Sequence, residues 1–217
     1  MEIVLSILFL LIGYALGSVN AAVIISKVLY KEDIRTQGSG NAGLTNMLRV
    51  YGKGAAGLTF LIDFCKGIVA CLLALLAASL LKESADVRSW YITAAGFGAI
   101  LGHNFPLYFG FKGGKGVLTS FAVMLFIVPL PALIALAVFV MVVAVSRYVS
   151  LGSMLAALSL VAAVFFAGDF LGTQSGFTVV FVFCLAAAIL LIVRHHANIG
   201  RLIKGKESKL SFKSKKK

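Results

Sequence analysis

A glycine-rich segment with two lysines, GFKGGKG at 110–116, contains residue types suited to binding a phosphate group. Its four glycines let the backbone approach a ligand closely and adopt left-handed conformations. Successive N–H groups in such a loop form a concave anion site, and the lysines add positive charge. A helix beginning at Val117 would present its N-terminus to the same anion. The pattern fits either a phosphate-binding loop or a flexible basic loop at a membrane surface. It lacks the Gly-Lys-Ser/Thr of a Walker loop.

Two further polar segments combine glycine with serine, asparagine, arginine and histidine. They are GSGNAGLTNMLR at 38–49 and RHHANIGRLIKGKE at 194–207. Each is a weak signal alone. If the three segments share one face of the protein, they predict a single site for an anionic, water-soluble ligand next to lipid. N–H groups, lysine and arginine in one cavity bind phosphate strongly.

The overall composition is that of a polytopic membrane protein. The chain has 217 residues, 60% of them hydrophobic and 13% charged, with a mean hydropathy of +1.02 and a net charge of +12. Several apolar runs exceed the roughly 18 residues that a membrane-spanning helix needs. We therefore expect one integral-membrane domain over 1–217, with a basic tail from about 194. Glu2 and the length of the first apolar run argue against a cleaved signal peptide.

Nothing else in the composition predicts a metal site, a cofactor or a nucleic-acid partner. The three cysteines, Cys65, Cys71 and Cys184, lie in apolar runs, and their number and spacing suit no metal site. They are interpreted as small apolar residues. Anionic lipid explains the basic tail as well as a nucleic acid would.

Hydrophobic runs predict seven membrane-spanning helices, at 3–25, 55–81, 90–105, 117–128, 132–146, 151–167 and 177–193. Pro129 and Pro131 separate the fourth helix from the fifth, because proline breaks or kinks a helix. One kinked helix, and hence six spans, is the alternative. The segment 35–49 is expected to be a loop or re-entrant segment, 168–176 a polar turn, and the tail partly disordered.

The placement of basic residues favours seven spans with the N-terminus outside and the C-terminus in the cytoplasm. This arrangement puts 27–53, Lys112, Lys115, Arg147 and the tail on the cytoplasmic side, leaving few basic residues outside. Six spans would divide the basic segments between the two sides. The three polar segments would then share the cytoplasmic face only in the seven-span arrangement.

Polar residues inside the predicted spans are a further signal. Asp63 and Lys66 are three residues apart on one helical face, where they can form an ion pair. Such intramembrane ions are functional candidates, although a pair that only fixes helix packing explains them equally well. Ser18 and Asn20 could hydrogen-bond to other helices or face the site.

Together, the segments 38–49, GHNFPLYFGFKGGKGVLT at 102–119, and 194–207 resemble the three signature segments of the PlsY-type bacterial glycerol-3-phosphate acyltransferases. The resemblance covers nearly the whole chain. It implies transfer of an acyl group from acyl phosphate, not from acyl-CoA or acyl carrier protein, to glycerol 3-phosphate. The product would be 1-acyl-glycerol 3-phosphate, made at the cytoplasmic side of the bacterial inner membrane without a cofactor. Leu44 departs from the family's usual alanine, which implies a local change in packing.

The resemblance also implies roles for individual residues. The candidate catalytic residues are Ser39, Arg49, His195 and Asn198, with His196 as the neighbouring alternative to His195. The candidate substrate-binding residues are Asn41, Thr45, Asn46, His103, Asn104, Lys112, Gly113, Gly114, Lys115 and Gly116. Glu207 corresponds to a structurally important glutamate of the family.

The chemistry of these residues is compatible with such a reaction. An acyl phosphate is already activated, so the acceptor hydroxyl needs orientation, charge screening and a route for its proton. Ser39 suits hydrogen bonding to a substrate oxygen better than nucleophilic attack, because no Ser-His-Asp arrangement is evident. His195 is a candidate base, although we favour a substrate phosphate as the proton acceptor.

Two other classes of protein are compatible with parts of the sequence. A transporter or exchanger of phosphate esters would also use a phosphate loop and intramembrane ions. Its polar segments would not be expected on one side only, and no internal repeat is visible. A non-catalytic scaffold would leave the clustered glycines unexplained.

Overall fold

The computed structural model describes residues 1–167 and 176–210, and this part of the chain is all-helical. Its α-helices are α1 (Glu2–Gly17), α2 (Ala21–Tyr30), α3 (Leu44–Tyr51), α4 (Lys53–Leu80), α5 (Ala85–Asn104), α6 (Val117–Ile127), α7 (Pro129–Ser146), α8 (Val149–Ala167), α9 (Phe177–Arg194) and α10 (His196–Ile203). Two short 3-10 turns, η1 (Ile34–Thr36) and η2 (Leu107–Phe109), lie in the loops. The structure does not describe 168–175, which is all but the last residue of the predicted turn at 168–176, or the tail beyond 210.

Five segments of the described chain are long and apolar enough to cross a membrane. They are Glu2–Tyr30, Lys53–Leu80, Pro129–Ser146, Val149–Phe166 and Phe177–Arg194. Large apolar side chains on their outer faces are exposed, as expected for contact with lipid. The protein is therefore an integral membrane protein, as its composition predicts.

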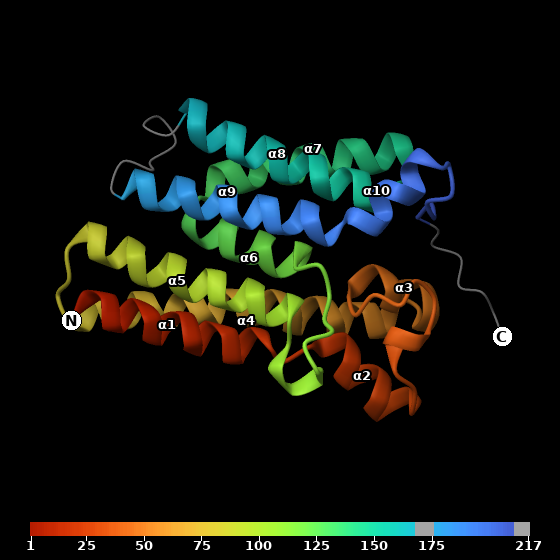
Figure 1. Cartoon of the computed structure of the whole chain (residues 1–217), viewed down its shortest axis with the longest axis horizontal. Helices are drawn as coiled ribbons and strands as arrows, with labels where there is room; N and C mark the ends of the chain where they lie inside the picture. Colours follow the sequence, from red (N-terminus) through yellow and green to blue (C-terminus); the bar gives the residue numbers. More distant parts are fainter. Residues whose placement is uncertain (168–175, 211–217) are drawn as a thin grey trace.

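Helix α6 is too short to cross a membrane alone. Its 11 residues span about 16 Å at 1.5 Å per residue, roughly half the hydrocarbon thickness. Val128 separates it from α7, so the prediction of two helices here is confirmed. Helix α7 begins at Pro129, three residues earlier than expected, because proline is tolerated in the first turn of a helix. The first turn of α6 lies part-way along the neighbouring helices, inside the bundle and not at an end of the bundle (Figure 1).

The first hydrophobic run is broken, so the prediction of one helix over 3–25 is wrong. Helix α1 ends at Gly17 and α2 begins at Ala21. The side chain of Asn20 caps α2 by accepting a hydrogen bond from the N–H of Val23 at 3.1 Å. Ser18 Oγ accepts one from the N–H of Leu107 at 3.2 Å. The predicted cross-helix hydrogen bonding thus coincides with the break.

Helices α1 and α5 pack with their backbones in close approach. A Cβ atom on Gly13 would overlap the carbonyl oxygen of Ala95, and one on Gly98 would overlap that of Leu10. Small residues at such contacts are characteristic of helix pairs in membranes, where dispersion contacts drive association. This pair fixes the end of α5, from which the glycine-rich segment follows.

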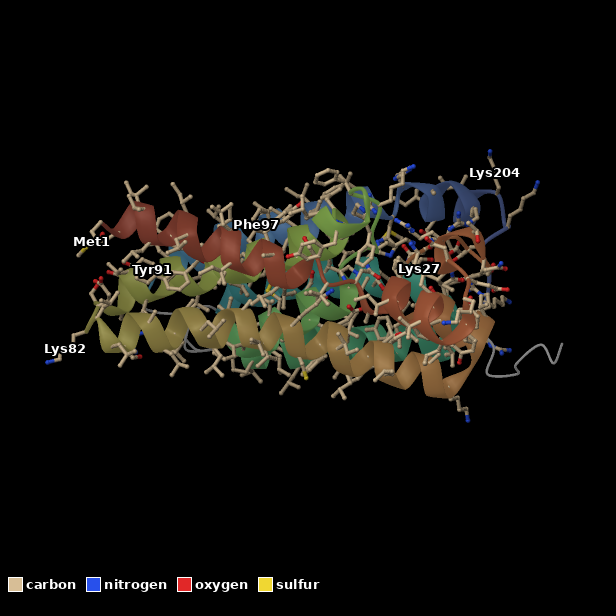
Figure 2. The ribbon with its side chains drawn as sticks, turned by 90° about the horizontal axis from the view of Figure 1, so that it is seen from below. Met1, Lys27, Lys82, Tyr91, Phe97 and Lys204 are labelled. Carbon is tan, nitrogen blue, oxygen red and sulfur yellow. The ribbon has the colours of Figure 1, made fainter. Side chains whose placement is uncertain are left out.

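The polar segments gather at one end of the bundle, where α2, α3 and α10 lie (Figure 1). Figure 2 shows Met1 and Lys82 at one end of the molecule and Lys27 and Lys204 at the other. The expectation of a loop or re-entrant segment over 35–49 is wrong in part, because α3 begins at Leu44. The first part of the basic tail forms helix α10, in which Asn198 is buried.

Candidate active site

A cavity of about 810 Å³ begins at this polar end and extends between α6, α7, α8 and α9. Its polar end is lined by residues from all three signature segments, among them Ser39, Arg49, Lys115, His195 and Asn198. Its deeper walls are apolar and include Phe121, Met124, Ala135, Phe139, Leu160 and Ala188. The cavity therefore combines a charged, hydrogen-bonding mouth with a hydrocarbon-like interior.

Asn46 holds the loop that carries Ser39. Its side-chain nitrogen donates to the carbonyl oxygens of Ile34, Gln37 and Asn41, and its oxygen accepts from the N–H of Ser39 at 2.9 Å. All the strong hydrogen-bonding groups of this buried amide are thus directed at the loop. Asn46 lines the cavity but its geometry is that of a residue that positions the backbone.

Arg49 and Thr45 lie one turn apart on α3 and both line the cavity. Within the described residues, the guanidinium group of Arg49 has no side-chain hydrogen bond or ion pair. Ser39 and Asn41 line the same part of the cavity from the preceding loop. The first signature segment thus presents a hydroxyl group and an arginine available to an anion.

The glycine-rich loop is built differently from the sequence expectation. The N–H of Gly113 donates to the carbonyl of Asn104 at 3.3 Å, and that of Gly114 to the carbonyl of His103 at 3.1 Å. These two N–H groups are used within the protein, so the expectation of a cradle of free N–H groups is wrong for them. A Cβ atom on Gly114 would lie 2.6 Å from the carbonyl oxygen of Ala42. The two glycines are required by close packing of the loop.

Gly116 marks the transition from this loop to helix α6. Its φ of +75° is in the left-handed region, where glycine is favoured, and α6 starts at the next residue as predicted. Gly116, Val117 and Leu118 line the cavity. The first N–H groups of a helix have no intrahelical partner, so this helix end offers donors to an anion in the cavity.

Lys115 connects the loop to the third signature segment. Its ammonium group donates to Oδ1 of Asn198, and Nδ2 of Asn198 donates to the carboxylate of Glu207. Burial lowers the pKa of Lys115 to about 8, opposed by the carboxylate of Glu207. Neighbouring guanidinium groups lower it further. Lys115 is therefore a cation at neutral pH with its ammonium group held in place.

Glu207 links three parts of the structure. Its carboxylate accepts hydrogen bonds from Ser150 Oγ on α8 at 2.7 Å and from Arg201 Nε on α10 at 2.7 Å, besides that from Asn198. Burial raises the pKa of Glu207, but these hydrogen bonds outweigh burial and hold the pKa below its ordinary value. This geometry agrees with a structural role for Glu207.

His195 is buried between α9 and α10 and lines the cavity. Its Nδ1 lies 2.8 Å from the carbonyl oxygen of Leu191, which can only accept, so Nδ1 carries the proton and Nε2 is an acceptor. Burial, then the charge of Lys115, lowers the pKa of His195 to about 4. His196 is exposed and is not among the residues lining the cavity. Of the two adjacent histidines, His195 is therefore the one that lines the cavity.

Several residues lining the cavity were missed by sequence reasoning. Arg194 donates from Nη2 to the carbonyl of Gly114 at 2.9 Å, and its guanidinium lies 5.0 Å from the ring centroid of Phe105. Ser150 and Ser153 reach the cavity from α8. Arg194 adjoins a signature histidine, and the two serines are three apart in an apolar run. These positions were the only features of the sequence that could have identified the three residues as part of the site.

Three predicted site residues, Lys112, Asn104 and Gly114, do not line this cavity. Lys112 lines a separate surface depression together with Lys27, Arg35 and Tyr108. Asn104 is fully buried behind the loop, next to Gly116. Gly114 is packed against His103 and Ala42, and the remaining predicted residues line the cavity.

The predicted ion pair between Asp63 and Lys66 is present, with a distance of 2.8 Å from Nζ to Oδ1. Lys66 Nζ also lies 3.0 Å from Nδ1 of His103 and 2.9 Å from the carbonyl oxygen of Val19. Asp63 and His103 both line the cavity. Asp63 and His103 are therefore part of the wall of the site, and Lys66 contacts both.

The mouth of the cavity is electropositive. Arg49, Lys115, Arg194 and Arg201 line it, whereas the acidic groups Asp63 and Glu207 are each paired with a cation. Within the described residues, no group of three His, Cys, Asp or Glu side chains is placed to hold a metal ion. The arrangement suits a phosphate or phosphate ester bound beside an apolar chain.

Comparisons with known proteins identify a family for this architecture. Residues 7–205 match the family model for glycerol-3-phosphate acyltransferase. A glycerol-3-phosphate acyltransferase of Halalkalibacterium halodurans is 42% identical over 208 residues, covering 94% of this chain and 95% of the relative. One from Listeria monocytogenes is 41% identical over 206 residues, covering 95% and 97%.

Two solved structures have the same fold. Both are crystal structures of PlsY (YgiH), an integral membrane glycerol 3-phosphate acyltransferase. Its glycerol 3-phosphate form has a TM-score of 0.82 at 36% identity. Its lysophosphatidic acid form has a TM-score of 0.79 at 37% identity. Each comparison covers 95% of this chain and 96% of the other.

Proposed function

The chain belongs to the glycerol-3-phosphate acyltransferase family, and we propose that it acylates glycerol 3-phosphate with an acyl phosphate as donor. The acceptor hydroxyl forms an ester bond to the acyl carbon, and the acyl–phosphate bond breaks. The products are 1-acyl-glycerol 3-phosphate and inorganic phosphate, in the first step of bacterial phospholipid synthesis. No cofactor takes part in this reaction, because the phosphate is already a good leaving group.

The observation that carries this proposal is the division of one cavity into a cationic mouth and an apolar interior. The mouth contains Arg49, Lys115 and Arg194, whereas Met124, Leu160 and Ala188 line deeper walls. An acyl phosphate has the same division between a dianionic head and a hydrocarbon chain. Both phosphate-bearing substrates can place their anionic groups among these cations, with the acyl chain directed between α6 and α9.

Ser39, Arg49 and Lys115 bind and polarise the phosphate groups in this scheme. Arginine contacts phosphate through two parallel N–H donors, and Lys115 acts as a point charge fixed by Asn198. Ser39 Oγ donates to a substrate oxygen on which charge builds during transfer. Asn41, Thr45 and the first turn of α6 complete the polar surface around these groups.

The proton of the acceptor hydroxyl passes to a substrate phosphate in our mechanism. His195 has a pKa of about 4, so it is a weak base at neutral pH, whereas a phosphate monoester has a second pKa of about 6. The unprotonated Nε2 of His195 instead accepts the hydroxyl hydrogen bond and orients the oxygen for attack. Transfer is direct, without an acyl-enzyme, since within the described residues no base is hydrogen-bonded to Ser39.

The orientation follows from charge. Lys27 and Lys204 lie at the end of the bundle that holds the site, and Met1 and Lys82 lie at the opposite end (Figure 2). The positive-inside rule supports a cytoplasmic site in the bacterial inner membrane. The N-terminus is then outside, with seven crossings in which α5, and the short α6 together with the loop before it, supplement the five longer segments. Lipid surrounds the apolar outer faces.

A purified sample in detergent tests the proposed donor. Given acyl phosphate and glycerol 3-phosphate, it should form lysophosphatidic acid without sealed vesicles, which a transporter of phosphate esters would require. Acyl-CoA and acyl carrier protein thioesters should not replace acyl phosphate. Equal rates with a thioester donor would reject acyl phosphate as the specific donor.

A further inference from the structure

Lys66 has three acceptor atoms around its buried ammonium group, two in hydrogen bonds and one in an ion pair. The acceptors are Val19 O at 2.9 Å, Asp63 Oδ1 at 2.8 Å and His103 Nδ1 at 3.0 Å. They belong to the break between α1 and α2, to α4 and to α5. A charged lysine has three donors and no acceptor, so Nζ can donate to Val19 O and His103 Nδ1 while its charge is paired with Asp63. The side chains of Lys66, Asp63 and His103 are all buried, which makes these contacts costly to break.

This arrangement determines which nitrogen of His103 carries the proton. Lys66 can only donate, so Nδ1 of His103 must be the acceptor, and the neutral ring then holds its hydrogen on Nε2. The opposite tautomer would set two donors against each other at 3.0 Å. Asp63 does not rescue that tautomer, because its Oδ1 lies 3.6 Å from Nδ1, beyond hydrogen-bond range.

The free end of the His103 ring lies at the glycine-rich loop. A Cβ atom on Gly114 would overlap Nε2, and the carbonyl of His103 accepts from the N–H of Gly114 at 3.1 Å. His103 also lines the substrate cavity. Within the described residues, Nε2 of His103 makes no hydrogen bond to the protein, whereas Nδ1 is paired with Lys66. A donor without a protein acceptor at the wall of a phosphate site suits a phosphate oxygen.

We propose that the Nε2–H of His103 donates a hydrogen bond to a phosphate oxygen of the substrate, and that Lys66 and Asp63 are positioning residues that fix this tautomer. The proposal rests on the proposed function. His103 and His195 then have complementary roles, because His195 carries its proton on Nδ1 and presents an accepting Nε2. One histidine stabilises negative charge, and the other orients the acceptor hydroxyl.

Nitrogen-15 NMR of the three histidines in the full-length protein tests the tautomers directly. A protonated ring nitrogen and an unprotonated one have well-separated chemical shifts. His103, assigned by its loss in His103→Gln, should have a protonated Nε2 and a bare Nδ1, and His195 should show the reverse. In Lys66→Met, His103 should become a mixture of tautomers while His195 is unchanged. A wild-type His103 with its proton on Nδ1, or on both nitrogens, would overturn the proposal.

Kinetics separate a donor from a packing role. His103→Leu should lower kcat/KM on the order of 10²-fold, the scale for removing one donor to developing charge. His103→Gln, whose amide can donate toward the same region, should recover at least a tenth of the wild-type value. Lys66→Met should lower kcat/KM by less than His103→Leu, because a fraction of the His103 rings still carries the proton on Nε2. Thr59→Val is the matched control, since Thr59 is buried on α4 but bonds only the carbonyl of Ala55.

These results distinguish failure of this inference from failure of the proposed donor. Full activity of a folded His103→Leu protein with acyl phosphate would reject the role of His103 and leave the reaction intact. Wild-type protein that rejects acyl phosphate would refute the donor, while the NMR result would still report the tautomer. If Lys66→Met does not accumulate, the wild-type spectrum and the Gln–Leu comparison at His103 still decide the question.

Discussion

The ammonium group of Lys115 donates a hydrogen bond to the side-chain oxygen of Asn198, which lies 83 residues further along the chain. Asn198 in turn donates to Glu207, which is paired with Arg201. The glycine-rich loop and helix α10 are thus joined through one amide. Because Asn198 accepts with one end and donates with the other, aspartate cannot replace it without losing the donor to Glu207.

Asn198→Asp should therefore impair glycerol 3-phosphate binding. The substitution places two carboxylates side by side, and the introduced carboxylate neutralises Lys115, so less positive charge is available to the substrate phosphate. We expect KM for glycerol 3-phosphate to rise on the order of tenfold or more, in line with the roughly 1.5–3 kcal/mol typical of a charged hydrogen bond. Steady-state kinetics measure it, and the exposed His196→Gln is a control of similar position. An unchanged KM would remove this link from substrate binding.

The pKa of Lys115 predicts an alkaline limit to activity. Lys115 is cationic below its pKa of about 8 and neutral above it, so it loses its attraction for phosphate as pH rises. The value of kcat/KM for glycerol 3-phosphate reports the free enzyme and should decline above about pH 8. Lys115→Arg should move this decline to higher pH, because arginine stays protonated. The same alkaline limb in both proteins would assign it to another group.

The structure changes the expected effect of alanine in the glycine-rich loop. The sequence predicts that Gly114→Ala blocks a bound phosphate and mainly raises KM. The added Cβ would instead meet the carbonyl oxygen of Ala42 at 2.6 Å, so the loop itself must shift. We expect a lowered melting temperature in detergent together with loss of activity. Gly57→Ala, which has nothing within 4 Å of its Cβ, should retain both. A wild-type melting temperature for Gly114→Ala would restore the sequence-based explanation.

Helix ends could be predicted from the sequence where apolar runs were long. They could not be predicted where polar contacts between distant residues determine the end of a helix. The apolar runs of α4 and α9 fixed their ends within about two residues of the structure. The break after Gly17 depends on Ser18 bonding Leu107, a contact 89 residues away that no local pattern reveals. Likewise, the internal use of the Gly113 and Gly114 N–H groups depends on where α5 ends. Motif residues could be identified, but their partners required the fold.

Thiol labelling tests the orientation. In a background without the native cysteines, Lys82→Cys and Lys204→Cys place single thiols at opposite ends of the molecule, where both side chains are exposed (Figure 2). An impermeant reagent applied to intact cells should label position 82 and not position 204. Labelling of 204 alone would reverse the orientation, and labelling of both from outside would contradict an odd number of crossings.

Direct transfer predicts that Ser39 is a hydrogen-bond donor and not a nucleophile. Asn46 fixes the backbone of Ser39, but within the described residues no base is hydrogen-bonded to its hydroxyl group. A serine hydroxyl without a base is a poor nucleophile at neutral pH. Ser39→Ala should therefore lose on the order of 10²–10³ in kcat, the scale for one donor to developing charge. Ser39→Cys, a matched variant with a better nucleophile but a weaker donor, should be similarly impaired.

Arg49 supplies the comparison that separates charge from geometry. Arg49→Lys should be nearly as damaging as Arg49→Ala, because lysine cannot reproduce a bidentate contact with phosphate. Steady-state kinetics of the two Arg49 variants measure this difference, whereas acyl retention by the wild-type protein decides the role of Ser39. Incubation with radiolabelled acyl phosphate alone, followed by denaturation, should leave no label on the chain. Stable label on Ser39, released by glycerol 3-phosphate with ping-pong kinetics, would establish an acyl-enzyme. The oxygen of Ser39 would then need a base that the free enzyme does not present, supplied by a phosphate of the bound donor.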